Sequence, residues 1–390
     1  MARTPEEFRE KQRIEVKIRH RVDAIAPHEK CVVVCDLASG RSWRESYDHL
    51  LIATGSQPID PELPGREAAG IFPIKNLAGG IALRRELDAR EIRRVVVVGA
   101  GYIGLEMVEN LLLRGLEVTV VEQGNQILPL LAPELAAQVE QAVAAGGAAL
   151  HLGKPLLGYE MKNGRVSGVA TDKQSLPADL VVLGMGVRPS SELAEAAGIE
   201  LGIKKAIRTD KRMATSSHGI WAAGDCAESY HVIDGRPYYL PLGTVANRHG
   251  RAAGANIAGD RVDYGGTAGT AVTRTCGAEV GMTGLLEKEL RESGIEVVSE
   301  TVQSRTRSGY FPGAGPIAVR LTADAASGRI LGGQIVGGEG AAKRIDVVAV
   351  AVQSGLTAAQ MSELDLGYAP PFSPVWDPVV IAARQLSKKL

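Results

Sequence analysis

The sequence predicts an α/β fold in which doubly wound, Rossmann-like domains are followed by an α+β domain. Two patterns lead to this prediction. A strand, a glycine turn and a helix follow one another from Arg93, and glycine-punctuated strands followed by a helix fill the chain beyond Gly265. The composition agrees, because 46 glycines and 4% aromatic residues are typical of tight turns around aliphatic cores.

Length and charge limit the class of protein. A chain of 390 residues is long enough for two or three domains, and its 44 basic and 45 acidic residues leave it nearly neutral. Such a balance provides no electrostatic attraction to nucleic acid or to a membrane surface. The N-terminus is charged from the start and no apolar run approaches the roughly 18 residues of a membrane helix, so we expect a cytoplasmic protein.

The cysteines and histidines predict no metal site. The four cysteines, at positions 31, 35, 226 and 276, form no Cys-x-x-Cys pair and no cluster with the seven histidines. Zinc sites and disulfide frameworks depend on such spacings, so we expect neither.

The first segments of the chain predict a small antiparallel meander and a buried strand. Ile14 to His20 and Cys31 to Cys35 are rich in β-branched residues and are separated by turn formers. Tyr47 to Thr54 predicts the buried strand. Thr4 and the residues after it have the pattern of a helix start, with no strand and glycine turn before them.

Residues 93 to 122 predict a nucleotide-binding βαβ unit. Its turn has the pattern Gly-x-Gly-x-x-Gly at Gly99, Gly101 and Gly104 and opens a helix. The first glycine permits a tight turn, the second allows backbone N–H groups to approach a pyrophosphate, and the third allows close packing of the helix. The helix N-terminus also favours a negatively charged ligand.

The acidic residue that ends the second strand of this unit indicates which nucleotide binds. Glu122 lies where a carboxylate accepts hydrogen bonds from a ribose 2′-OH and repels a 2′-phosphate. Residues 123–125 supply no arginine to receive such a phosphate. The sequence therefore favours NADH over NADPH, although NADPH stays open.

The rest of the chain predicts the remaining elements in order. Pro133 to Ala145 has the apolar spacing of a helix, Asn163-Gly164 is a hairpin signal, and Leu180 to Leu183 is a buried strand. Two shorter motifs, Thr54-Gly55 and Gly224-Asp225, each end a strand. Either of them alone is common at strand ends, and their order around the glycine turn is what gives them weight.

Together these motifs resemble those of the FAD-dependent pyridine nucleotide-disulfide oxidoreductases. They are ATG at 53–55, GAGYIGLE at 99–106, the acid at 122, GMGVRP at 184–189 and AAGD at 222–225, and they extend over essentially the whole chain. The resemblance implies an incomplete FAD-binding domain (residues 1–75 and 188–259), an NAD(P)-binding domain (76–187) and a C-terminal dimerisation domain (260–390).

The resemblance also implies roles for single residues. Thr54 and Gly55 would lie at the crossover between the FAD and NAD domains, and Asp225 would hydrogen-bond the flavin ribitol. Tyr102 would cover the flavin until nicotinamide displaces it, with Glu106 near the nicotinamide. The cofactor-binding residues implied in full are Thr54, Gly55, Gly99, Gly101, Tyr102, Ile103, Gly104, Glu106, Glu122, Gly186, Gly224 and Asp225.

Within the family, the last domain is most similar to coenzyme A-disulfide reductases and related NADH oxidases, through residues 309–314, 343–346 and 368–372. In those reductases, tyrosines that match Tyr310 and Tyr368 reach across a homodimer into the partner's active site. A phenol there can protonate a sulfur leaving group, which makes both residues candidate catalytic acids. The alternative for both is an interface-packing tyrosine with a satisfied hydroxyl, and for Tyr368 the catalytic role is the one we favour.

Two parts of the family pattern do not occur in this sequence: the first Gly-x-Gly-x-x-Gly, which holds FAD, and the helix with the redox cysteine. We therefore expect an N-terminally truncated chain. The function that the resemblance implies is reduction of a disulfide by NADH through FAD. Among disulfides, the similarity of the last domain favours coenzyme A disulfide as the substrate. The alternatives are an NADH oxidase or peroxidase, and a non-catalytic protein that binds NAD(H) and dimerises.

Overall fold

The computed structural model describes residues 3–390. The chain forms two compact units, and both are built from segments that are separate in the sequence. The first unit contains the chain up to Ser56, Arg188–Tyr230 and Arg236–Gly266, and the second contains Gln57–Val187, His231–Gly235 and Thr267–Leu390. The domain boundaries expected from the sequence stay predictions.

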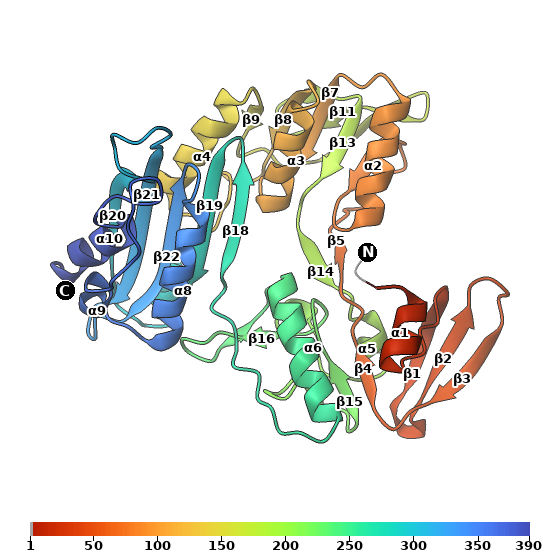
Figure 1. The fold of residues 1–390 in the computed structure, drawn as a ribbon. Coiled ribbons are helices and arrows are strands. Elements are labelled where there is room, and N and C mark those ends of the chain that lie inside the picture. Colours follow the sequence, from red (N-terminus) through yellow and green to blue (C-terminus); the bar gives the residue numbers. More distant parts are fainter. Residues whose placement is uncertain (1–2) are drawn as a thin grey trace. The chain divides into compact units, whose positions relative to one another are not determined.

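The first unit begins with helix α1 (Pro5–Gln12) and a three-stranded antiparallel sheet (Figure 1). Thr4 caps α1: its hydroxyl accepts a hydrogen bond from the Glu7 N–H, and the Glu7 carboxylate accepts one from the Thr4 N–H. The sheet consists of β1 (His20–Ala26), β2 (Cys31–Asp36) and β3 (Ser42–Ser46).

The predicted strand from Ile14 to His20 is wrong. The extended strand starts only at His20, because Arg13 and Arg19 both have left-handed backbone conformations, with φ of 56° and 58°. Arg13 ends α1, and Arg19 interrupts the extended backbone immediately before β1. The alternating apolar residues between them do not form a strand.

A parallel pair of short strands forms the rest of the first unit's framework. β4 (Leu50–Ile52), shorter than the predicted Tyr47–Thr54, pairs with β15 (Ile220–Ala222). The unit also contains the helices α5 (Glu192–Ala196) and α6 (Gly243–Ile257), the 3₁₀ turns η1 (Pro27–Glu29) and η2 (Ile203–Lys205), and the pair β16 (Ser229–Tyr230) and β17 (Pro237–Tyr238). The chain passes between the units in β5 (Ser56–Pro58) and β14 (Val187–Pro189).

The second unit contains a five-stranded parallel sheet. Its order is β6-β13-β7-β8-β9, and every neighbouring pair is parallel. The strands are β6 (Ile71–Pro73), β7 (Arg94–Val98), β8 (Glu117–Val121), β9 (Ala149–His151) and β13 (Leu180–Leu183). Helices α2 (Leu77–Ala89), α3 (Tyr102–Leu112) and α4 (Pro133–Ala145) and a small sheet of β10 (Gly158–Lys162), β11 (Arg165–Ala170) and β12 (Ser175–Pro177) complete this part.

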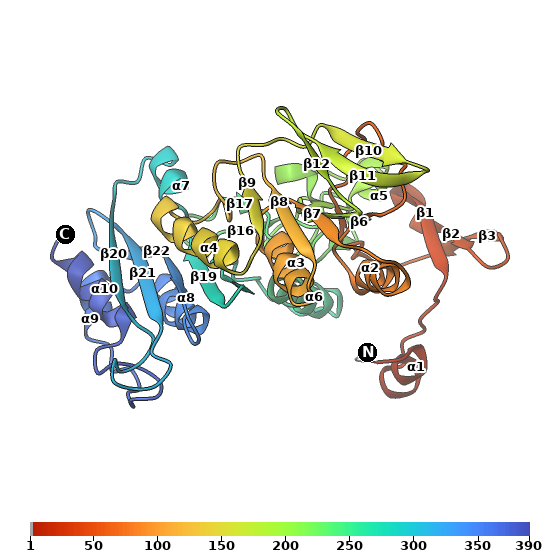
Figure 2. The same ribbon diagram turned by 90° about the horizontal axis from the view of Figure 1, so that it is seen from above.

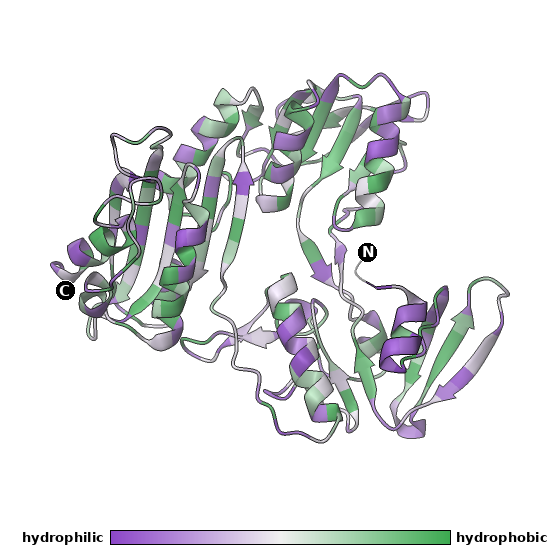
Figure 3. Ribbon diagram, viewed as in Figure 1, coloured by the Kyte–Doolittle hydropathy of each residue, from purple (hydrophilic) through white to green (hydrophobic). Residues whose placement is uncertain are grey.

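Alternate residues of β7 face different layers. Val95 and Val97 pack in a core with α3 and α4, whereas Val96 and Val98 pack in a separate core with β11. A strand that is covered on both faces is apolar throughout, as the sequence of β7 shows. In Figure 3 the strands of this sheet are accordingly coloured as hydrophobic.

The C-terminal part of the second unit is an antiparallel sheet with helices beside it (Figure 2). Its order is β18-β19-β22-β21-β20. The strands are β18 (Ala271–Thr275), β19 (Ala278–Gly284), β20 (Val297–Arg305), β21 (Pro316–Asp324) and β22 (Ile330–Gly337), and the helices are α7 (Glu287–Glu292), η3 (Ala342–Arg344), α8 (Ile345–Ser354), α9 (Ala358–Ser362) and α10 (Pro378–Ser387). The α/β class with a C-terminal α+β part is thus confirmed.

No helix within residues 3–390 is both long enough and apolar enough to cross a membrane.

The core of the first unit contains a histidine with unusual surroundings. His249 on α6 is completely buried, and neither of its ring nitrogens has a hydrogen-bond partner in the described chain. Its ring meets that of Tyr264 edge-on, with 4.5 Å between the centroids. Burial, and to a smaller extent the nearby Arg248 guanidinium, lowers the pKa of His249 to about 4.

We predict that His249 makes the protein less stable in acid. Because its folded-state pKa lies below its unfolded value, its stabilising effect is complete above pH 6.5 and is lost as the pH falls toward 4. Urea unfolding at pH 7.5 and at pH 4.5 gives the free energy of unfolding at each pH. The decrease in this free energy from pH 7.5 to 4.5 should be about 2–3 kcal/mol smaller in His249→Leu than in the parent chain. His218→Gln, at an exposed position, is the matched control and should behave like the parent; equal losses in all three chains would contradict the prediction.

Candidate functional site

The turn between β7 and α3 has three glycines in three different environments. Gly99 has a φ of 96°, and a Cβ atom built there would lie 2.6 Å from the Gly184 carbonyl oxygen. A Cβ on Gly104 would lie 2.0 Å from the Gly99 carbonyl oxygen. Gly101 has nothing within 4 Å of its Cβ position. Two of the glycines therefore permit close packing within the protein, and the third leaves open space.

That open space lies at the start of a helix. Gly101 is the N-cap of α3, and no side chain caps the helix there. The first N–H groups of a helix have no partner within the helix, and the helix dipole favours negative charge at this end. The turn therefore fits a dinucleotide pyrophosphate, which needs N–H donors and close approach of the backbone.

The Glu122 carboxylate is fixed beside this turn. One of its oxygens accepts a hydrogen bond from the Ala100 N–H (2.8 Å) and the other accepts one from the Gly124 N–H (2.7 Å). Each carboxylate oxygen can accept more than one hydrogen bond, so both keep capacity for ribose hydroxyls. The contact with Ala100 was not predicted from the sequence. Through this hydrogen bond, Glu122 also stabilises the backbone of the glycine turn.

The first two turns of α3 carry three predicted cofactor residues besides Gly104. Tyr102 and Glu106 are four residues apart, so they lie on one face of the helix, and both are exposed. Ile103 is partly buried. The Thr273 hydroxyl, on β18, donates a hydrogen bond to the Glu106 carboxylate (2.8 Å). Thr273 was not predicted from the sequence, because no local motif marks it.

Residues 184–186 lie against the same turn. A Cβ on Gly184 would be 2.7 Å from the Gly104 Cα atom, so this glycine is required for the packing of α3. Gly186 is exposed, with a φ of 90°, and its carbonyl oxygen accepts a hydrogen bond from the Ile59 N–H (2.9 Å).

The first unit has its own cavity, of about 320 Å³, at the ends of β4 and β15. It is lined by Leu51, Ala53, Gly55, Ala223, Gly224, Asp225, Ala246 and Gly250. Asp225 is oriented by two neighbours: the Ser56 hydroxyl donates to its carboxylate (3.0 Å), and the Tyr239 hydroxyl donates to its carbonyl oxygen (2.9 Å). Ser56 directly follows the Thr54-Gly55 motif, which is the signal that could have indicated it.

These residues fit part of a flavin dinucleotide. An oriented carboxylate can accept hydrogen bonds from the hydroxyls of a polyol chain. Gly55 and Gly224 have positive φ values of 71° and 84°, which let the backbone turn at the end of each strand. The nearby helix α6 begins at Gly243 without a side-chain cap, so its N–H groups can face an anion. Thr54 instead donates its hydroxyl to the Ser190 carbonyl oxygen (2.5 Å).

Tyr310 and Tyr368 lie on two loops that are tied together in the C-terminal part of the second unit. The Ser308 N–H donates to the Pro370 carbonyl oxygen (3.2 Å). The Ser308 hydroxyl donates to the Ser373 carbonyl oxygen (3.4 Å). Both tyrosines are exposed, 78% for Tyr310 and 47% for Tyr368.

None of the four cysteines lines the first unit's cavity. Cys226 is fully buried, and its sulfur contacts the carbonyl oxygens of Ile52 (3.4 Å) and Ala223 (3.3 Å). Burial raises the pKa of Cys276, and it is therefore less easily ionised. Cys31 is buried on β2, where the Arg44 side chain donates a hydrogen bond to its sulfur (3.3 Å), and Cys35 is partly buried.

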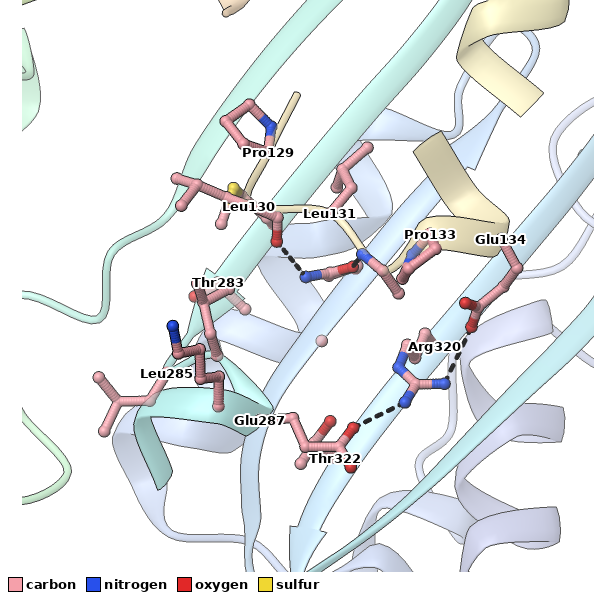
Figure 4. A pocket seen from close by; sticks show the side chains of 16 residues that line it. Pro129, Leu130, Leu131, Pro133, Glu134, Thr283, Leu285, Glu287, Arg320 and Thr322 are labelled. Atoms are coloured by element: carbon pink, nitrogen blue, oxygen red, sulfur yellow. Dashed lines mark hydrogen bonds and ion pairs between the residues drawn. The ribbon is translucent and has the colours of Figure 1, made fainter. Parts of the chain in front are cut away.

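A second cavity, of about 270 Å³, lies in the second unit between the loop before α4 and the C-terminal sheet (Figure 4). Gln334 on β22 joins the two: its amide accepts a main-chain N–H (2.7 Å) and donates to a main-chain carbonyl (2.8 Å) of this loop. Arg320 on β21 donates to Glu134 (3.0 Å) and Glu287 (2.7 Å). Because the polar groups that line this cavity bind one another, we interpret it as a contact that holds the loop to the sheet and not as a ligand site.

Comparison with known families decides the class of protein. Residues 2–250 match the pyridine nucleotide-disulphide oxidoreductases, and residues 270–378 match the dimerisation domain of the same family. The chain belongs to this family. Its members are FAD-dependent NAD(P)H oxidoreductases that act on disulfides or persulfides.

Three relatives show the range of activities. The NADH oxidase of Methanocaldococcus jannaschii is 35% identical, over 99% of this chain and 86% of its own length. The CoA-dependent NAD(P)H sulfur oxidoreductase of Pyrococcus abyssi is 37% identical, over 87% of this chain and 76% of its own. The coenzyme A disulfide reductase of Staphylococcus aureus is 30% identical, over 96% of this chain and 83% of its own.

A solved structure agrees with the fold over nearly the whole chain. The crystal structure of reduced Bacillus anthracis CoADR-RHD superposes with a TM-score of 0.95 at 33% identity, over 99% of this chain and 70% of the other.

We predict that two glycine variants separate packing from ligand approach. In Gly104→Ala the new Cβ clashes with the Gly99 carbonyl, so the melting temperature should fall and NADH binding should weaken roughly tenfold or more. In Gly101→Ala the Cβ has space in the protein but occupies the room for the pyrophosphate, so binding should weaken. The melting temperature should fall less than in Gly104→Ala, because the only cost to the fold is that alanine is a poorer helix N-cap than glycine.

Thermal unfolding and NADH titration by fluorescence measure the two effects. Gly80→Ala, on α2 with nothing near its Cβ position, is the matched control. It should leave NADH binding unchanged and should not lower the melting temperature, because alanine favours a helix more than glycine does. Undiminished NADH binding by Gly101→Ala would show that the pyrophosphate does not bind at this turn.

Proposed function

We propose that this chain binds NADH at the α3 turn and FAD at the first unit's cavity, and that it supplies the NADH half of a coenzyme A-disulfide reductase. The observation that carries the proposal is the turn itself: an uncapped helix start with open space at Gly101 and a fixed carboxylate at Glu122. The sulfur substrate is supported by the Staphylococcus aureus and Pyrococcus abyssi relatives, whose names specify coenzyme A.

The residues of the chain have distinct roles in this proposal. FAD, when bound, would supply two-electron transfer between NADH and the sulfur substrate. Gly99, Gly101 and Gly104 hold the pyrophosphate of NADH, and Tyr102 and Glu106 lie at its nicotinamide end. Asp225, held by Ser56, orients the polyol chain of the flavin.

The sulfur half of the reaction needs a thiolate next to the flavin, and none of the four cysteines lines the cavity proposed for it. We therefore propose that the redox cysteine belongs to a segment that this sequence does not include, as the predicted truncation implies. Tyr310 and Tyr368 would protonate the departing thiolate of the substrate.

We further propose that the working form is a homodimer. Several large apolar side chains of the C-terminal part are exposed, among them Tyr310, Phe372 (75%) and Trp376 (55%). Such a concentration is typical of a surface that another protein covers. The match to a dimerisation domain over residues 270–378 supports a second copy of the chain as that protein.

The second candidate is an NADH oxidase, in which oxygen or peroxide is the oxidant. It is favoured by the name of the Methanocaldococcus jannaschii relative, which matches 99% of this chain. A third candidate, a non-catalytic NAD(H)-binding dimer, is favoured by the absence of a cysteine from the lining of the first unit's cavity.

Anaerobic spectroscopy distinguishes these candidates. We expect the purified chain, supplied with FAD, to retain it as a dimer and NADH to bleach the flavin absorption. It should reduce ferricyanide, whereas it should release thiol from coenzyme A disulfide only when it is joined to a segment with the redox cysteine. Oxygen consumption without thiol release by that joined protein would favour the oxidase. A colourless protein that binds no FAD would leave only the third candidate.

We predict that Glu122 sets the preference for NADH. A 2′-phosphate placed beside its carboxylate is repelled, so NADPH should bind roughly tenfold or more weakly than NADH. Glu122→Gln removes the charge and also weakens the hydrogen bonds to the turn, so both affinities should fall but their ratio should move toward one. Calorimetric titration with each nucleotide measures this ratio. If the substitution left the ratio of NADH to NADPH affinity unchanged, Glu122 would not be the residue that selects NADH.

A further inference from the structure

We propose that Thr273 is a positioning residue for Glu106, through which the C-terminal antiparallel sheet orients the nicotinamide end of the bound nucleotide. This inference rests on the proposed NADH site. The observation behind it is the hydrogen bond from the Thr273 hydroxyl to the Glu106 carboxylate (2.8 Å), which joins residues 167 positions apart in the chain.

The geometry of β18 explains why Thr273 reaches this carboxylate. Alternate residues of a strand share a face, so Thr273 and Thr275 point the same way. The Thr275 hydroxyl donates to the Leu105 carbonyl oxygen (2.9 Å), which fixes that face of β18 against α3. Arg274, on the opposite face, approaches Glu109 at the longer distance of 3.8 Å. Two neighbouring contacts therefore hold the strand in register with the helix.

The Glu106 side chain depends on this contact for its orientation. The side chain is exposed, and among the described residues the Thr273 hydroxyl is the hydrogen-bond partner of its carboxylate. An exposed glutamate otherwise samples several rotamers, and fixing it on binding costs conformational entropy. Thr273 removes part of that cost in advance, because it holds one carboxylate oxygen before the nucleotide arrives.

The chemistry of the held carboxylate indicates which part of the nucleotide it recognises. With one oxygen accepting from Thr273, the other is available to accept an N–H hydrogen bond. The nicotinamide carboxamide has an NH₂ group that can donate such a bond, whereas the pyrophosphate, an anion, is repelled. Glu106 lies one helical turn beyond Tyr102, away from the glycine turn that would hold the pyrophosphate. Thr273 should therefore affect the nicotinamide half of the ligand and not the ADP-ribose half.

The test compares binding of NADH with binding of ADP-ribose, which lacks nicotinamide, by calorimetric titration of the full chain. Thr273→Val keeps the shape of the side chain and removes the hydroxyl. We expect it to weaken NADH binding about fivefold, as for the loss of one hydrogen bond, and to leave ADP-ribose binding unchanged. Thr273→Ser keeps the hydroxyl and should restore NADH binding.

Two further variants separate positioning from stability. Thr275→Val removes the neighbouring hydroxyl of the same face; it should lower the melting temperature without changing the ratio of NADH to ADP-ribose affinity. If Thr273 acts through Glu106, adding Thr273→Val to Glu106→Ala should change NADH binding no further.

The inference is overturned if Thr273→Val weakens both ligands equally or neither, or if its effect adds to that of Glu106→Ala. A parent chain that binds neither ligand overturns the NADH site together with this inference. A parent chain that binds both but reduces no disulfide affects only the proposed substrate.

Discussion

The close approach of helix α3 to the turn that precedes it is the constraint on which the site depends. Gly104, Gly99 and Gly184 meet where any Cβ would lie within 2.0–2.7 Å of a backbone atom. This contact fixes how closely α3 packs against the glycine turn. The positions of its N-terminal N–H groups, of Tyr102 and of Glu106 all depend on that packing. A methyl group at the contact therefore changes the ligand site without touching the ligand.

The same helix is held from a second direction by the C-terminal sheet. The contacts from Thr273 and Thr275 on β18 are made to α3, and Gln334 on β22 binds the loop before α4. The C-terminal sheet, which lies within the match to the family's dimerisation domain, thus also supports the nucleotide fold within one chain. A substitution that disrupts this sheet is therefore expected to disturb the nucleotide site as well.

Local patterns in the sequence predicted the elements that depend on local interactions. The glycine turn, the helix Pro133–Ala145 and the strand Leu180–Leu183 were all found as predicted, because turn chemistry and periodicity determine them. The strand from Ile14 failed because a left-handed Arg19 interrupts it, and no pattern marks an arginine for that conformation. Thr273 could not be predicted, since its partner lies 167 residues away. Ser56 was marked only by its place after Thr54-Gly55, and its contact with Asp225, 169 residues away, is visible only in the structure.

The burial of Cys226 has a practical consequence. Cys226 is enclosed between the ends of β4 and β15 in the first unit, whereas the partly buried Cys276 lies in the hairpin between β18 and β19 in the second. The Cys226 sulfur becomes available to a thiol reagent only when the structure around it opens. The rate at which a mild alkylating reagent labels Cys226 would therefore report, without any engineered probe, how often the first unit opens, with Cys276 as an internal reference for the reagent.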